Sequence, residues 1–144
     1  MLTARFDLIG LVVADLPASL AFYRRLGLDI PDVPDDAPHV EVELPGGLRL
    51  AFDPVDTVRS FDPSWEPPAG SPRIGLAFLV DRPEEVDALH DELVAGGHPS
   101  HLGPFDAAWG QRYATVLDPD GNHVDLFAPL TPNPPIDRPS DSGP

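Results

Sequence analysis

The chain has 144 residues, a length that suits one domain or two small repeated halves sharing a core. Its 24 acidic and 9 basic residues give a formal net charge of −15, which repels phosphate and argues against a nucleic-acid partner. Cysteine is absent, so disulfides, thiol catalysis and thiolate metal sites are excluded. No apolar run reaches membrane-spanning length and no signal-peptide pattern opens the chain, so we expect a cytoplasmic protein without a membrane partner.

The first part of the chain predicts a strand, a helix and a hairpin. The expected elements are a strand over 6–14, a helix from Asp15 to Gly27, and strands over 39–44 and 48–52, with a short edge strand over 29–33 left open. Asp15 suits the helix start because its carboxylate can accept hydrogen bonds from free backbone N–H groups. Gly27 suits the helix end because glycine adopts a positive φ without strain.

The second part repeats this order. The expected elements are a strand over 73–80, a helix from Asp81 to Gly96-Gly97, a short strand around 98–102, and a long hairpin running from Trp109 to Phe127. In the helix Val86, Leu89 and Leu93 form the expected buried stripe, with Glu84 as the capping acid. Gly121 predicts a tight turn in the hairpin. Strand alternation then places His123, Asp125 and Phe127 on one sheet face.

The two Asp-x-Pro helix starts, at 15 and 81, indicate an internal repeat. The expected parts are a first module over 1–53, a linker over 54–72, a second module over 73–129, and a Pro-rich tail over 130–144 expected to be disordered. Phe61 and Trp65 are too apolar for a free linker, so we expect them to pack on something. The fold class is therefore α+β: two tandem βαβββ modules that form a curved mixed sheet around a central cleft.

Three segments resemble the vicinal oxygen chelate superfamily, the glyoxalase, bleomycin resistance protein and dioxygenase group. They are Gly10–Gly27, Gly75–Asp81 and Asp118–Phe127, and the resemblance extends over about residues 5–128. It implies the two-module fold just described. It does not by itself imply one chemistry, because this fold carries several unrelated activities.

Enzymes of this family typically hold a divalent metal on four side chains that point into the cleft. The resemblance places those four positions at Leu8, Leu50, Gly75 and Asp125. Only Asp125 offers a donor, and a divalent cation needs several N or O donors at fixed distances. We therefore expect no metal cofactor. The alternative is a divalent metal on displaced ligands, Asp125 with His123.

Without a metal, the expected site is an apolar cleft wall that carries one acidic group. The expected ligand-binding residues are Leu8, Leu50, Phe52, Trp65, Trp109, Arg112, Asp125 and Phe127. The segment Trp109-Gly110-x-Arg112 resembles bleomycin-resistance-type members, in which an aromatic side chain at the cleft rim packs on a flat ligand. Two alternatives stay open: Trp109 as a core or interface residue, and Arg112 as the partner of a hairpin aspartate.

The favoured interpretation is a metal-free binding protein, not an enzyme, that sequesters a planar or cationic small organic molecule such as an antibiotic. No catalytic residue is required. The acidic charge either steers a cation toward the cleft or serves solubility alone. The resemblance implies a homodimer. The alternatives are a metal-dependent lyase, isomerase or dioxygenase, a metal-free enzyme that uses Asp125 or His123 as acid or base, and a ligand-free interaction protein.

Overall fold

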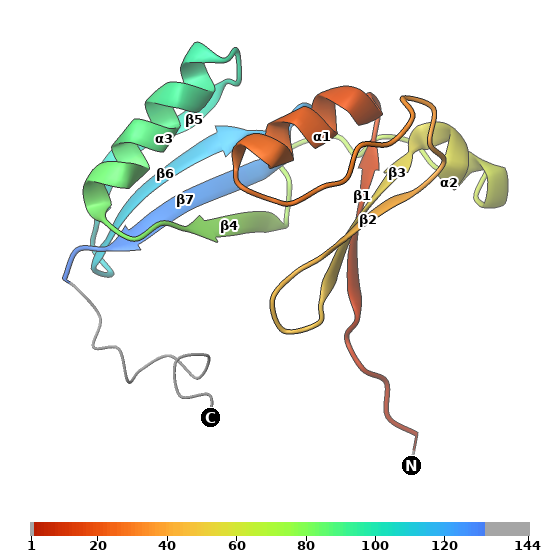
Figure 1. Cartoon of the computed structure of the whole chain (residues 1–144), viewed down its shortest axis with the longest axis horizontal. Coiled ribbons are helices and arrows are strands. Elements are labelled where there is room, and N and C mark those ends of the chain that lie inside the picture. Colours follow the sequence, from red (N-terminus) through yellow and green to blue (C-terminus); the bar gives the residue numbers. More distant parts are fainter. Residues whose placement is uncertain (1, 132–144) are drawn as a thin grey trace. The chain divides into compact units, whose positions relative to one another are not determined.

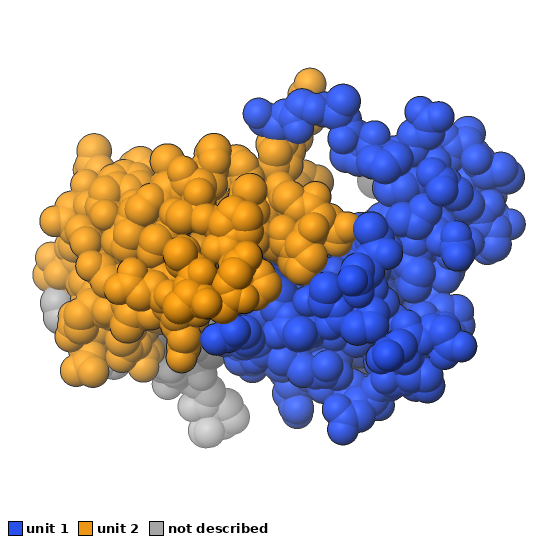
Figure 2. All heavy atoms as spheres, turned by 90° about the horizontal axis from the view of Figure 1, so that it is seen from above, with its two compact units in different colours: residues 1–71 blue, residues 72–144 orange. Residues whose placement is uncertain are grey.

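The computed structural model describes residues 2–131, so most of the predicted tail, 132–144, lies outside the described residues. The described chain is an α+β structure with seven strands in two sheets and three helices (Figure 1). It divides into two compact units, residues 1–71 and 72–144, which are coloured separately in Figure 2. None of the helices within residues 2–131 has the length and apolar character needed to span a bilayer.

The first unit is a three-stranded sheet with a helix against one face (Figure 1). Its elements are β1 (Leu8–Val13), α1 (Leu16–Arg25), β2 (Val40–Glu43), β3 (Arg49–Pro54) and α2 (Val55–Phe61). The strand order is β1-β3-β2, with β1 parallel and β2 antiparallel to β3. Tyr23 of α1 packs on Phe52 of β3, with ring centroids 5.4 Å apart, and this contact identifies the sheet face that α1 covers.

Local sequence chemistry sets the ends of α1, as predicted. Asp15 is the N-cap, and its Oδ1 accepts a hydrogen bond of 3.1 Å from the backbone N–H of Ala18. This bond satisfies one of the amides that have no partner inside the helix. Gly27 follows the helix with a φ of 99°, the conformation that makes glycine suitable there.

Two segments of the first unit differ from the prediction. Residues 29–33 form no strand. The stretch predicted as a linker contains α2, a helix too short for its periodicity to be recognised. Val58 of α2 is buried, and the Thr57 hydroxyl donates to the carbonyl of Pro38 at 2.6 Å, so the helix is tied to the rest of the unit. Phe61, which was expected to pack, is 73% exposed.

The strand register corrects the predicted facing of β3. Parallel pairing places Ile9 opposite Leu50 and Leu11 opposite Phe52, so Leu50 and Phe52 share the face covered by α1. Both are buried, at 3% and 0% exposure, and therefore belong to the core rather than to a cleft wall beside Leu8. Alternation within each strand was right. The predicted pairing of β1 with β3 was wrong by one residue, and such a shift moves every side chain of β3 to the other face of the sheet relative to β1.

The second unit is a four-stranded sheet with one long helix (Figure 1). Its elements are β4 (Gly75–Leu79), α3 (Pro83–Ala95), β5 (Ser100–Ala107), β6 (Gln111–Leu117) and β7 (His123–Pro129). The order is β4-β7-β6-β5, with β4 parallel to β7 and the other pairs antiparallel. Helix α3 packs on β5, β6 and β7. Its buried residues are Val86, His90 and Leu93, so His90 takes the place in the core predicted for Leu89.

Strand β5 is longer than predicted and moves Trp109 into a turn. The pairing of β5 with β6 continues to Ala107 through two register shifts, on either side of Leu102. Pro104 is accommodated there because β5 is the edge strand of its sheet. Trp109 consequently lies in the turn between β5 and β6, beside Gly110 with a φ of 89°.

Candidate functional site

The second sheet has one face under α3 and one face that carries no helix of its own unit (Figure 1). We call the latter the open face. By register it carries Gly75, Ala77 and Leu79 of β4, His123, Asp125 and Phe127 of β7, and Tyr113 and Thr115 of β6, with Phe105 of β5 opposite Tyr113. Most of this surface is apolar or aromatic, and Asp125 is its acidic group.

Two hydroxyl groups fix the carboxylate of Asp125. The phenol of Tyr113 donates to Oδ2 at 2.5 Å, and the hydroxyl of Thr115 donates to Oδ1 at 2.7 Å. Burial raises the pKa of Tyr113 to about 12, with a smaller contribution from the hydrogen bond to Asp125. Tyr113 therefore remains a donor at neutral pH, and the carboxylate is held in one orientation.

Three rings form an aromatic cluster beside this carboxylate: Phe105, Trp109 and Tyr113. The centroid of Trp109 lies 5.4 Å from that of Tyr113, and the centroid of Phe105 lies 6.0 Å from Tyr113 and 6.4 Å from Trp109. All three pairs are edge-to-face, an arrangement that aromatic rings favour. The indole N–H donates to Oε1 of Gln111 at 2.8 Å, yet Trp109 is 62% exposed. A flat ligand can therefore reach the indole of Trp109.

Arg112 lies on the α3 side of the sheet, because it alternates with Tyr113 along β6. Its Nε and Nη2 each donate to a carboxylate oxygen of Asp87 at 2.8 Å, and its Nη1 donates to Asp106 at 3.0 Å. The hydrogen bonds from Arg112 hold the pKa of Asp87 below its usual range. The alternative of structural pairing is thus observed, although with Asp87 of α3 and Asp106 of β5 rather than with an aspartate of the β6–β7 turn.

The other predicted site residues divide between the two units. Trp109, Asp125 and Phe127 belong to the second unit, with Asp125 and Phe127 on the open face. Leu8, Leu50, Phe52 and Trp65 belong to the first unit. Trp65 lies under the guanidinium of Arg59, with 5.7 Å from Cζ to the ring centroid.

Sequence reasoning missed three residues of the open face: Phe105, Tyr113 and Thr115. Tyr113 and Thr115 had a usable signal, since two polar side chains two residues apart in a strand share a face. Phe105 gave none, because it lay in a stretch that was expected to be a loop.

The donor set near Asp125 does not fit the family's metal centre. A Cβ placed on Gly75 would lie 3.4 Å from Asp125 Oδ2, so the structure brings two of the four family positions together, but Gly75 offers no donor. The ring of His123 lies against that of His101, with centroids 4.4 Å apart and the ring planes tilted by 32°. No group of three or more His, Asp or Glu suited to holding a metal ion occurs within residues 2–131.

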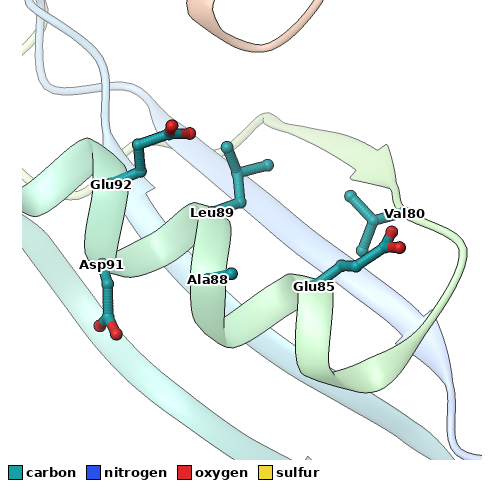
Figure 3. A pocket seen from close by; sticks show the side chains of 6 residues that line it. All are labelled: Val80, Glu85, Ala88, Leu89, Asp91 and Glu92. Carbon is teal, nitrogen blue, oxygen red and sulfur yellow. The ribbon is translucent and has the colours of Figure 1, made fainter.

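A hollow on the α3 flank is a weaker candidate. It is lined by Val80, Glu85, Ala88, Leu89, Asp91 and Glu92 (Figure 3). Three of these six residues are acidic, no ring is among them, and Asp91 points away from Leu89 and Glu92 in Figure 3. The hollow lacks the aromatic surface that the open face has, and its Glu85 carboxylate already accepts from the backbone N–H of Asp81 at 3.2 Å.

The face of the first sheet opposite Leu50 and Phe52 carries a charged network beside Leu8. The Nδ1 atom of His39 lies 2.5 Å from Asp53, and its Nε2 atom lies 2.7 Å from Glu41. Both hydrogen bonds raise the pKa of His39, and the bond with Asp53 has the larger effect. Arg49 donates to Glu41 at 2.7 Å and also pairs with Asp7. The charged side chains of this network are paired with one another, which makes the open face of the second sheet the better candidate site.

Comparisons with known proteins agree with this architecture. A family profile described as "Glyoxalase/Bleomycin resistance protein/Dioxygenase superfamily" matches residues 5–126. A solved glyoxalase/bleomycin resistance protein/dioxygenase from Nocardioides is 26% identical with a TM-score of 0.69, and the match covers 94% of this chain and 89% of that chain. No curated protein matches the chain.

Two further solved structures show the same fold at lower identity. A glyoxalase/bleomycin resistance protein/dioxygenase family enzyme from Burkholderia phytofirmans PsJN is 21% identical, with a TM-score of 0.75 over 88% of this chain and 100% of that one. A lactoylglutathione lyase from Agrobacterium tumefaciens is 23% identical, with a TM-score of 0.61 over 88% and 94%. At these identities the likeness concerns the fold alone.

Proposed function

The chain belongs to the glyoxalase/bleomycin resistance protein/dioxygenase superfamily, and on that premise we propose that it binds a planar organic cation without a metal and holds it unchanged. The observation that carries the proposal is the aromatic cluster around Tyr113, whose phenol also fixes the carboxylate of Asp125. Rings beside a fixed carboxylate suit a flat ligand with positive charge.

Binding on this surface would come from stacking and burial. A well-placed aromatic pair contributes about 0.5–1.5 kcal/mol beyond the area that it buries, and a cation over a ring adds a similar amount. The net charge of −15 would raise the encounter rate of a cationic ligand. Antibiotics with flat, positively charged ring systems belong to this ligand class. A homodimer remains part of the proposal, on the family resemblance alone.

The test uses 9-aminoacridine, a planar cation at neutral pH, in calorimetric titrations of dialysed protein. We expect saturable binding that is strongly reduced in Trp109→Ala and retained in Phe61→Ala, a control that removes another exposed aromatic ring outside the aromatic cluster. Since the proposal requires no metal, binding should be unaffected by a chelator.

Two results would overturn the proposed function. The first is a stoichiometric metal, found by elemental analysis after dialysis, whose removal abolishes binding. The second is chemical conversion of the bound ligand, followed by mass spectrometry of the recovered compound.

A further inference from the structure

Resting on the proposed function, we infer that Gly75, Ala77 and Asp125 form a notch on the open face that receives the cationic head of the ligand. The head would be an N–H-bearing cation, an ammonium or amidinium group, that donates to Oδ2 of Asp125. The notch is distinct from the aromatic cluster, which would hold the flat body of the same ligand.

The pairing of β4 with β7 leaves the carboxylate accessible on one side. Ala77 lies opposite Asp125, and Gly75 lies opposite His123, so the two smallest side chains of β4 flank the acid on the open face. Both are exposed. A Cβ added to Gly75 would come within 3.4 Å of Oδ2 and 3.8 Å of the His123 carbonyl. A branched side chain at position 75 would therefore cover Oδ2, whereas glycine leaves it open.

Asp125 has no cationic partner among residues 2–131 in the salt bridges of this structure, unlike several other acidic groups. Asp87 and Glu41 each accept from an arginine, and Asp53 is paired with His39. The two donors to Asp125 are neutral hydroxyl groups. Its negative charge on an apolar surface is thus left without a counter-charge, which a bound cation would supply.

The hydroxyl bonds also leave room for a further donor. An ionised carboxylate offers about four acceptor positions, and the hydroxyls of Tyr113 and Thr115 occupy two of them. Because these bonds fix the plane of the carboxylate, the remaining lone pairs keep a constant direction. An N–H cation forms a hydrogen bond with Asp125 in which both partners are charged, whereas an uncharged amide of the same shape offers a donor without the opposite charge.

The experiment compares benzamidine with benzamide, two planar molecules of nearly the same size that differ in charge. In the wild-type protein we expect benzamidine to bind about tenfold more tightly, because only benzamidine carries a charge opposite to that of Asp125. Asp125→Asn, which preserves the size of the side chain, should abolish this preference. Gly75→Val should weaken benzamidine binding, Gly75→Ala should weaken it less, and the matched control Gly103→Val should have no effect. Thermal melts establish that each variant is folded.

The proposed notch would be contradicted if the wild-type protein bound both probes equally, or bound neither. This comparison uses the wild-type protein alone, so it does not depend on any variant folding. A preference that survives Asp125→Asn would overturn it as well. The proposed function fails separately: loss of 9-aminoacridine binding, with the benzamidine preference intact, would contradict the stacking surface and leave the notch standing.

Discussion

The phenol of Tyr113 on β6 reaches Asp125 diagonally on the neighbouring strand β7, with 2.5 Å between Oη and Oδ2. Directly opposite Asp125 in the pairing of β6 with β7 is Thr115, and directly opposite Tyr113 is Phe127. The acid is thus held from two successive positions of β6, which share a face because side chains alternate along a strand.

Tyr113 should titrate well above an ordinary tyrosine. Its pKa is raised from 10.0 to about 12 by burial first and by the bond to Asp125 second, so the folded state is favoured below pH 10.0 and loses this contribution as the pH rises through about 12. Ultraviolet absorbance at alkaline pH, compared between wild type and Tyr113→Phe, isolates this residue from Tyr23. In Asp125→Asn the pKa should fall only partly, because burial remains. An identical titration in wild type and Tyr113→Phe would contradict the assignment.

Phe52→Ala should destabilise the protein strongly, because Phe52 is 0% exposed and packs on Tyr23. A large-to-small change in such a core position costs about 3–5 kcal/mol in the free energy of unfolding. Leu8→Ala, on the opposite and partly exposed face of the sheet, should cost only about 1 kcal/mol. Urea denaturation measures both, and equal losses would mean that Phe52 does not belong to the core.

His39 should make stability depend on pH in the neutral range. Both ring nitrogens lie against carboxylates, Asp53 and Glu41, so the pKa of His39 is raised from 6.5. Its contribution is therefore fully present below 6.5 and is lost as the pH rises through the higher folded-state value. Between about pH 5.5 and pH 9, the urea midpoint of the wild type should fall toward that of His39→Gln. A constant difference between the two proteins would contradict this.

Gly121→Ala should cost about 1–2 kcal/mol, because an L-residue is strained at the φ of 83° that the turn requires. No atom lies within 4 Å of the added Cβ, so backbone strain is the only cost. Gly103→Ala is the control, since its Cβ also meets nothing within 4 Å and its φ is not in the left-handed region. Equal thermal stability of both variants would show that the turn relaxes.

Local chemistry was readable from the sequence, and pairing was not. Asp15, Gly27 and Gly121 were predicted correctly, because a cap or a turn depends on a few adjacent residues. The facing of Leu50 was wrong, because its phase relative to β1 is a property of two distant strands. Strand β5 was cut short because Pro104 argues against a strand until its position at the sheet edge is known.

The same distinction holds for the candidate site. The sequence pointed to Asp125 and Trp109, but their companions depend on register: Tyr113 comes to Asp125 only through the pairing of β6 with β7. Arg112 lay in a motif that suggested ligand contact. Its partner Asp87 is 25 residues away on α3, a separation at which sequence spacing gives no guidance.

The ionic surface of the first sheet, from Asp7 and Arg49 to His39, has a consequence for the choice of solvent. Dissolved salt weakens exposed charge pairs, with a Debye length of about 10 Å at 0.1 M, while contacts among the rings of the second sheet are nearly indifferent to it. Alcohols would weaken the apolar contacts among the rings and leave the ion pairs in place. The two sheet faces thus differ in what perturbs them, and salt concentration becomes a means of weakening the ion pairs of the first face without acting on the rings of the second.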